Sequence, residues 1–192
     1  MRRGYVLAAV AVAVLVVLDQ MAGKNNNALD VAEIGAGLAV NYAMGADVVN
    51  MQLSDAGLAA IARREGFSAK KYPDAGGFSI GYGHFIQMGE SFDGVISQAD
   101  AMGLLLADTE IAQRAVRAYV TVPLTQNQFD ALTSLVYNIG AGNFKKSQTL
   151  ADLNAGDNAG AAAEMAGFNK SGGEYLAALA ARRADEVQQF FA

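Results

Sequence analysis

Residues 65–84 of this chain of 192 residues read EGFSAKKYPDAGGFSIGYGH. After the glycine pair Gly76-Gly77, bulky side chains alternate with small ones from Phe78 to Tyr82. Alternation of this kind next to glycines is typical of short antiparallel strands joined by a tight turn. The stretch therefore predicts a small β-hairpin over residues 72–82.

Helix signals flank this hairpin on its N-terminal side. Ser54 is expected to cap a helix that ends near Gly66, with Leu58, Ile61 and Ala62 at its buried positions. The hairpin thus follows directly from the end of a helix.

The rest of the chain is predicted to be helical. Ser97 with Asp100 and Thr125 with Gln128 have the spacing of capping boxes, and the helices they start should end near Val120 and Gly140. Shorter helices are expected at 147–154 and 157–167. The last helix is expected at 173–191, with its apolar side chains turned inward: Leu176, Leu179, Val187 and Phe190. The predicted fold class is α+β, with a small β-hairpin lobe and a larger helical lobe.

Composition excludes several classes of function. The net charge is −5 and no basic stripe follows a predicted helix, so the chain lacks the electrostatic signature of a nucleic-acid-binding protein. It contains no cysteine and a single histidine, His84, which argues against disulfides and against a metal site built on these ligands. We expect neither a metal nor an organic cofactor.

Two carboxylates flank the turn that leads into the hairpin. Glu65 stands at the end of the helix and Asp74 lies nine positions later, and hydrolysis of a glycosidic bond needs two carboxyl groups. This spacing alone does not establish a site. Glu65 is equally compatible with a solvated residue paired with Arg64 or Lys70, and Asp74 with an ordinary turn aspartate.

Further motifs strengthen the functional interpretation. The stretch at 65–84, preceded by MQLSDAGLAAIARR at 51–64, resembles the catalytic segment and entry helix of phage-type lysozymes, the endolysins or muramidases of glycoside hydrolase family twenty-four. PLTQNQFDALTSLVYNIGAGNF at 123–144 is similar to the central helix of that family. The stretches at 153–173 and 181–191 are similar to its closing helices. The resemblance covers residues 51–192 and implies a lysozyme-like catalytic domain.

The resemblance implies roles for three side chains. The family pattern has a glutamate, eight residues, an aspartate or cysteine, five residues and a threonine. Glu65 would be the general acid and Asp74 the carboxylate that positions the attacking water. Ser79 occupies the threonine position, where its hydroxyl would hold the water by a hydrogen bond, although only four residues separate it from Asp74. Family members invert stereochemistry, so the two carboxyls should lie about 6.5–9.5 Å apart.

Other residues are assigned by the same resemblance. Four of them are expected to contact the substrate: Gly81, Tyr82, Gly83 and Asn138. His84 is expected to be a structural residue, hydrogen-bonded near the base of the hairpin. Arg182 and Arg183 match an arginine pair that is expected to contact carboxylates instead of substrate.

The activity implied is hydrolysis of the β-1,4 bond between N-acetylmuramic acid and N-acetylglucosamine in peptidoglycan glycan strands, by a monomeric catalytic domain. Two alternatives stay open on the sequence. One is a wall-binding module that has lost the chemistry, and the other is a transglycosylase, which needs no aspartate to hold water.

The N-terminus has a different character. Arg2 and Arg3 precede an apolar run over residues 5–18, which predicts a signal-anchor or signal-peptide-like segment at 1–23 that delivers the chain to the host inner membrane and periplasm. Residues 24–50 are expected to be a linker or a loose helix. The alternatives for the apolar run are a buried helix or a contact in a virion-associated lysozyme.

Overall fold

The computed structural model describes residues 48–74 and 76–192. Residues Asp47–Ala192 form one compact unit. The predicted membrane segment at 1–23 and nearly all of the segment at 24–50 lie outside the described residues. Within the described part of the chain, no helix is both long enough and apolar enough to span a bilayer.

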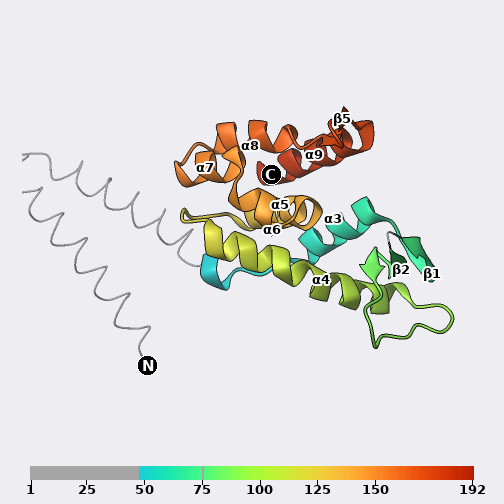
Figure 1. The fold of residues 1–192 in the computed structure, drawn as a ribbon. Coiled ribbons are helices and arrows are strands. Elements are labelled where there is room, and N and C mark those ends of the chain that lie inside the picture. The colour runs from blue at the N-terminus through green and yellow to red at the C-terminus, as the bar shows by residue number, and fades with distance from the viewer. Residues whose placement is uncertain (1–47, 75) are drawn as a thin grey trace, which may run out of the picture. The chain divides into compact units, whose positions relative to one another are not determined.

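Short strands form a lobe of their own, the β lobe (Figure 1). Strand β1 (Ser68–Asp74) pairs antiparallel with β2 (Gly77–Gly81), and β2 pairs with the two-residue strand β3 (His84–Phe85). The predicted hairpin is therefore confirmed, but it starts earlier than expected and gains a third strand.

The helices make up the larger lobe (Figure 1). In chain order they are the 3-10 turn η1 (Val48–Asn50), α3 (Asp55–Glu65), α4 (Gln98–Tyr119), α5 (Gln126–Ile139), α6 (Ala141–Lys145), α7 (Gln148–Asn154), α8 (Asn158–Ala166) and α9 (Ala177–Phe190). The α+β, lysozyme-like plan expected from the sequence is thus confirmed for the described residues.

Local signals explain where the main helices begin. The side chains of Ser54, Ser97 and Thr125 accept hydrogen bonds from the first turns of α3, α4 and α5, and the last two belong to complete capping boxes. Both α3 and α5 end at a glycine with positive φ, Gly66 and Gly140. These predicted boundaries are confirmed, because each depends on residues three or four positions apart.

The C-terminal prediction needs correction. The helix expected at 173–191 begins only at Ala177, and the residues before it form a second hairpin of β4 (Lys170–Ser171) and β5 (Glu174–Tyr175). Leu176, expected to face inward, is 43% exposed, whereas Phe190 is buried as predicted. The inner face of α9 instead carries Arg183 and Glu186, both fully buried.

Apolar side chains form two clusters in the described region. The larger one surrounds α5, with Phe129, Leu132 and Leu135 fully buried. The smaller one joins α3 to α4 and contains Leu53, Leu58, Ile61, Ala62 and Leu105. The smaller cluster therefore holds in place the helix that carries Glu65.

Candidate active site

Glu65 is the last residue of α3, so it stands where the helical lobe meets the β lobe. The helix is anchored at its other end, because Ser54 donates a hydrogen bond of 2.5 Å from its hydroxyl to Asp130 on α5. Gly66 ends the helix with a φ of 74°, a conformation that favours glycine. The chain then turns into β1, which leaves the Glu65 side chain at the junction.

A distant arginine contacts this carboxylate. Arg182 on α9 donates from Nη1 to Oε1 of Glu65 at 2.7 Å. The side chain of Arg182 is 10% exposed and that of Glu65 23% exposed, so water screens the pair only in part. One oxygen of Glu65 is therefore fixed by the helical lobe.

Arg182 is itself held by a buried charged group. Its Nε donates to Oε1 of Glu186 at 3.1 Å, and the Ser134 hydroxyl donates to the same oxygen at 2.6 Å. Arg183 pairs with Glu186 through Nε at 2.7 Å. The prediction that Arg182 and Arg183 contact carboxylates is confirmed, and we call these residues with Ser134 and Glu186 the α9 charge network.

Tyr137 is a residue that the sequence analysis did not single out. Its ring packs against both apolar clusters, and it precedes Asn138 near the end of α5. Burial raises the pKa of the Tyr137 phenol, and the negative charges of Glu65 and Asp108 raise it further. The phenol therefore stays protonated and can donate a hydrogen bond close to Glu65.

Asp74 and Ser79 meet across the hairpin. Asp74 is the last residue of β1 and pairs with Gly77, while Ser79 lies opposite Tyr72 on β2. The Ser79 hydroxyl, which is fully buried, donates to Oδ2 of Asp74 at 2.6 Å. The two side chains are therefore hydrogen-bonded, although the spacing between them is one residue shorter than in the family pattern. A serine hydroxyl has one proton, so this bond leaves only its lone pairs for a water molecule.

The two glycines of the GYG segment, Gly81 and Gly83, have different neighbours. Gly83, at a φ of 87°, lies beside the acid, because a Cβ added there would be 4.0 Å from Oε2 of Glu65. Gly81 is packed against α4, where an added Cβ would meet Ala101 at 3.0 Å. This tight packing explains why position 81 is a glycine without any contact to substrate.

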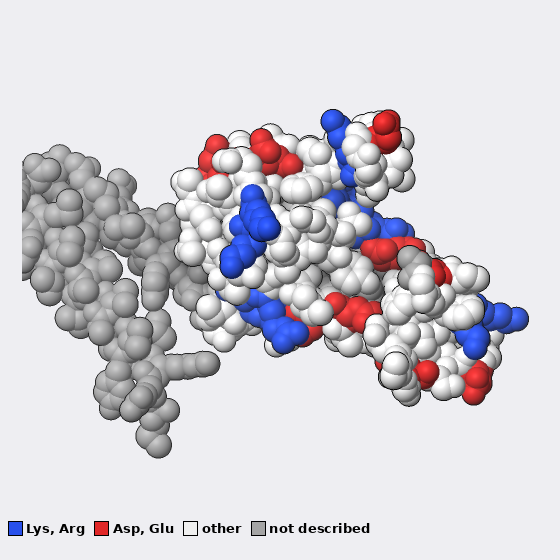
Figure 2. Space-filling view, in the orientation of Figure 1, with Lys and Arg blue, Asp and Glu red and all other residues white. Residues whose placement is uncertain are grey.

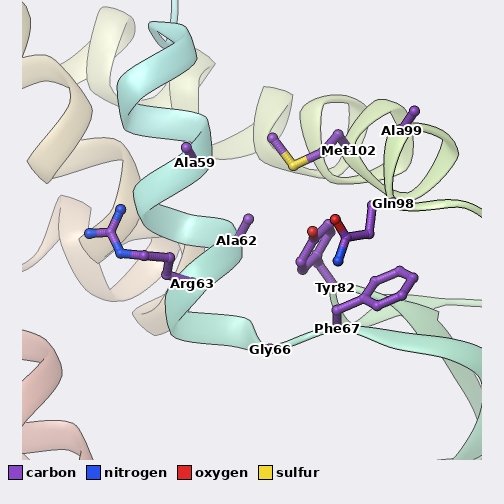
Figure 3. A pocket seen from close by; sticks show the side chains of 9 residues that line it. All are labelled: Ala59, Ala62, Arg63, Gly66, Phe67, Tyr82, Gln98, Ala99 and Met102. Atoms are coloured by element: carbon purple, nitrogen blue, oxygen red, sulfur yellow. The ribbon is translucent and has the colours of Figure 1, made fainter.

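Tyr82 lines a cavity of about 500 Å³ between α3 and the start of α4 (Figure 3). Its ring lies 5.4 Å from that of Phe67, centroid to centroid, and Met102 of α4 also lines the space. Neither Glu65 nor Asp74 lines this cavity. Of the four residues expected at the substrate, Gly83 lies beside Glu65, and Asn138 is exposed near the end of α5.

His84 is fixed between two carboxylates. Its Nδ1 lies 2.9 Å from Oδ2 of Asp108 on α4, and its Nε2 lies 3.0 Å from Oε2 of Glu90. Although burial lowers it, the hydrogen bonds to Asp108 and Glu90 raise the pKa of His84 above 6.5 overall. The expectation of a structural, hydrogen-bonded histidine at the hairpin base is confirmed.

Comparison with known proteins identifies the family. The family described as phage lysozyme matches residues 62–186, which is more than half of the chain. The chain belongs to the phage lysozyme family. The matched residues include the end of α3, both hairpins and the α9 charge network.

Individual relatives agree with this assignment. This phage lysozyme is 41% identical over 143 residues to the endolysin of Bacillus phage PZA, a match covering 73% of this chain and 55% of that protein. The chain thus spans about half the length of that relative. It is 32% identical over 123 residues to a protein of Enterobacteria phage P21 named a SAR-endolysin, covering 62% of this chain and 72% of the relative.

The fold agrees with a solved structure as well. A crystallised point mutant of the lysozyme of phage P22 superposes with a TM-score of 0.69 at 34% identity, covering 74% of this chain and 99% of the other. The lysozyme-like arrangement of the described residues is therefore supported by structure and by sequence.

Proposed function

We propose that this phage lysozyme hydrolyses the β-1,4 bond between N-acetylmuramic acid and N-acetylglucosamine in bacterial peptidoglycan. The observation that carries the proposal is a half-buried glutamate at the end of α3 followed by an aspartate at the end of β1, in a chain of this family. Most glycoside hydrolases use a pair of carboxyl groups in these roles.

Glu65 is proposed as the general acid. Arg182 fixes Oε1, while Oε2 faces Gly83, where the lack of a side chain leaves room for the sugar oxygen that receives the proton. Proton delivery by a positioned carboxyl group accelerates such reactions by about 10²–10⁴-fold.

Asp74 is proposed to orient the attacking water, with Ser79 as a positioning residue. The Ser79 hydroxyl donates to Oδ2 and so helps to orient a carboxylate that would accept a hydrogen bond from water. The inverting outcome, and the carboxyl separation of about 6.5–9.5 Å that it requires, stay predictions.

The proposal is tested with the purified full chain on isolated peptidoglycan. Glu65→Gln keeps the side-chain shape but cannot deliver a proton, so we expect turnover to fall by about 10²–10⁴-fold or more with an unchanged melting temperature. The matched control is Glu164→Gln on α8, an exposed glutamate outside the site, which should keep full activity.

Two results would count against the proposal. Wild-type turnover by a folded Glu65→Gln protein would remove the assigned acid. Anhydro-sugar ends in the products would show a transglycosylase instead of a hydrolase.

Export to the periplasm is proposed as well, through a signal-anchor at residues 5–18. Arg2, Arg3 and the apolar run support it, as does the similarity to a SAR-endolysin. The test is fractionation of cells that express the full chain. Protein found only in the cytosol with an intact N-terminus would refute it.

A further inference from the structure

The β4–β5 hairpin is an exposed structure that the fold does not need for its core. Its turn, Gly172-Gly173, has φ values of 58° and 88°, the two positive angles of a tight type I′ turn. Every residue from Lys170 to Leu176 is exposed. The hairpin nevertheless has a defined shape, because the Leu176 amide donates to the Asn169 carbonyl at 2.9 Å and closes its base.

This hairpin is tied to the candidate site by the helix that follows it. Arg182, which holds Glu65, comes six residues after Leu176, a rise of roughly 9 Å along α9. Figure 1 shows β5 on the same side of the molecule as the end of α3 and the β lobe. In Figure 2 the surface is hollowed between these two projecting parts, with acidic and basic side chains at the bottom of the hollow.

Tyr175 is the side chain of the hairpin with the largest apolar surface. It is 61% exposed, and the register pairs it with Lys170, so both side chains emerge on one face. An aromatic ring held exposed on a closed hairpin offers a fixed apolar face that gains from being covered by a ligand. Sugar rings offer apolar faces of carbon-bound hydrogens edged by hydroxyls, which match a ring that ends in a phenol.

We propose that Tyr175 is a platform on which a sugar ring of the glycan strand stacks, away from the ring whose bond is cleaved. This inference rests on the proposed function and adds a binding contact to it. Such a contact holds the ground state and the transition state equally, because it is remote from the reacting atoms. It should therefore act on KM and not on kcat.

The test compares three full-length variants on purified peptidoglycan. Tyr175→Ala is expected to raise KM by about threefold to tenfold with kcat unchanged. Tyr175→Phe keeps the ring and should stay within about twofold of the wild type. Ile111→Ala, which removes a side chain of similar exposure (64%) on α4, is the control and should leave KM unchanged.

A binding measurement separates this inference from the proposed function. In the Glu65→Gln background, cosedimentation with intact peptidoglycan should weaken about threefold to tenfold on adding Tyr175→Ala. Unchanged binding and KM for Tyr175→Ala would overturn the platform even if the enzyme is active. Loss of binding in a chain that never hydrolyses peptidoglycan would keep the platform and reject the hydrolase.

Discussion

The two candidate carboxylates are supported by very different parts of the molecule. Glu65 is held from a helix 117 positions away, by Arg182 and the buried α9 charge network behind it. Asp74 is exposed and is held by Ser79, five positions away on the same hairpin. The acid is thus tied to the global fold, whereas the proposed water-positioning group is held by a hydrogen bond within its own hairpin.

The difference has a consequence for what each region tolerates. Charges inside the helical lobe are costly to disturb, because a buried group that loses its partner is not rescued by water. An exposed carboxylate such as Asp74 can be solvated when a partner is lost. Damage on the α9 side should therefore appear as lost stability, and damage on the hairpin side as lost activity.

The largest effect is expected from Arg183→Met. Arg183 and Glu186 are both fully buried, so removing the guanidinium leaves a poorly compensated carboxylate and should lower the free energy of unfolding by about 3–5 kcal/mol. Arg114→Met on the exposed face of α4 is the matched control, and it should cost about 1 kcal/mol or less. Urea denaturation followed by circular dichroism measures both.

A double variant tests whether the loss comes from the unpaired charge of Glu186. Arg183→Met with Glu186→Leu removes both charges and should recover part of the lost stability, since apolar replacements of buried pairs are often neutral. If the single variant were as stable as the Arg114→Met control, the α9 charge network would not stabilise the fold.

An effect of intermediate size, on kcat, is expected from Ser79→Ala. It removes the hydrogen bond to Asp74, so kcat on peptidoglycan should fall about tenfold while stability changes by about 1 kcal/mol. Ser79→Thr keeps the hydroxyl and should restore most of the rate. A loss as deep as that of Glu65→Gln would mean that the hydroxyl takes part in the reaction directly and does not only orient Asp74.

The smallest effect concerns pH and the base of the β lobe. The pKa of His84 is raised in the fold, so its ion pairs with Asp108 and Glu90 contribute fully below the unfolded value of 6.5 and are lost as pH rises through the raised value. His84→Gln should cost about 1 kcal/mol near pH 6, or about 2–4 °C in melting temperature. That difference should vanish in alkaline solution, and a constant difference across pH would contradict the assignment.

The stabilisation by His84 and its two carboxylate partners also has a lower pH limit. The Gln87 amide and then His84 lower the pKa of Glu90 below 4.5, so its contribution is present above that value and fades as pH falls through the lowered one. Melting curves recorded between these limits should show the greatest advantage of the wild type over His84→Gln.

The sequence predicted local features of the structure better than long-range contacts. Ser54, Ser97 and Thr125 were identified as caps because their partners lie in the next turn of the same helix. Asp74 and Ser79 were assigned separately, by resemblance, and the hydrogen bond between them was not predicted. The partnership of Glu65 with Arg182 was not predicted, since sequence spacing says nothing about which of several arginines crosses to α3.

The errors on α9 have a physical explanation. Leu176 was expected inside because apolar side chains normally face the core, but it belongs to the base of an exposed hairpin. Arg183 and Glu186 were not expected inside because buried charges are rare, and here each compensates the other. The turn at Gly172-Gly173 was the one available signal, since paired glycines favour a hairpin over a helix start.

The separation of the apolar side chains into two clusters has a consequence for cooperativity. The cluster that fixes α3 has five buried members and depends on α4, whereas the α5 cluster contains most of the large buried side chains described. A region with fewer buried contacts opens at a lower free energy than the whole molecule. The smaller cluster is therefore expected to loosen first, and the bonds from Ser54 to Asp130 and from Arg182 to Glu65 are what would keep the acid in place until the α5 core itself unfolds.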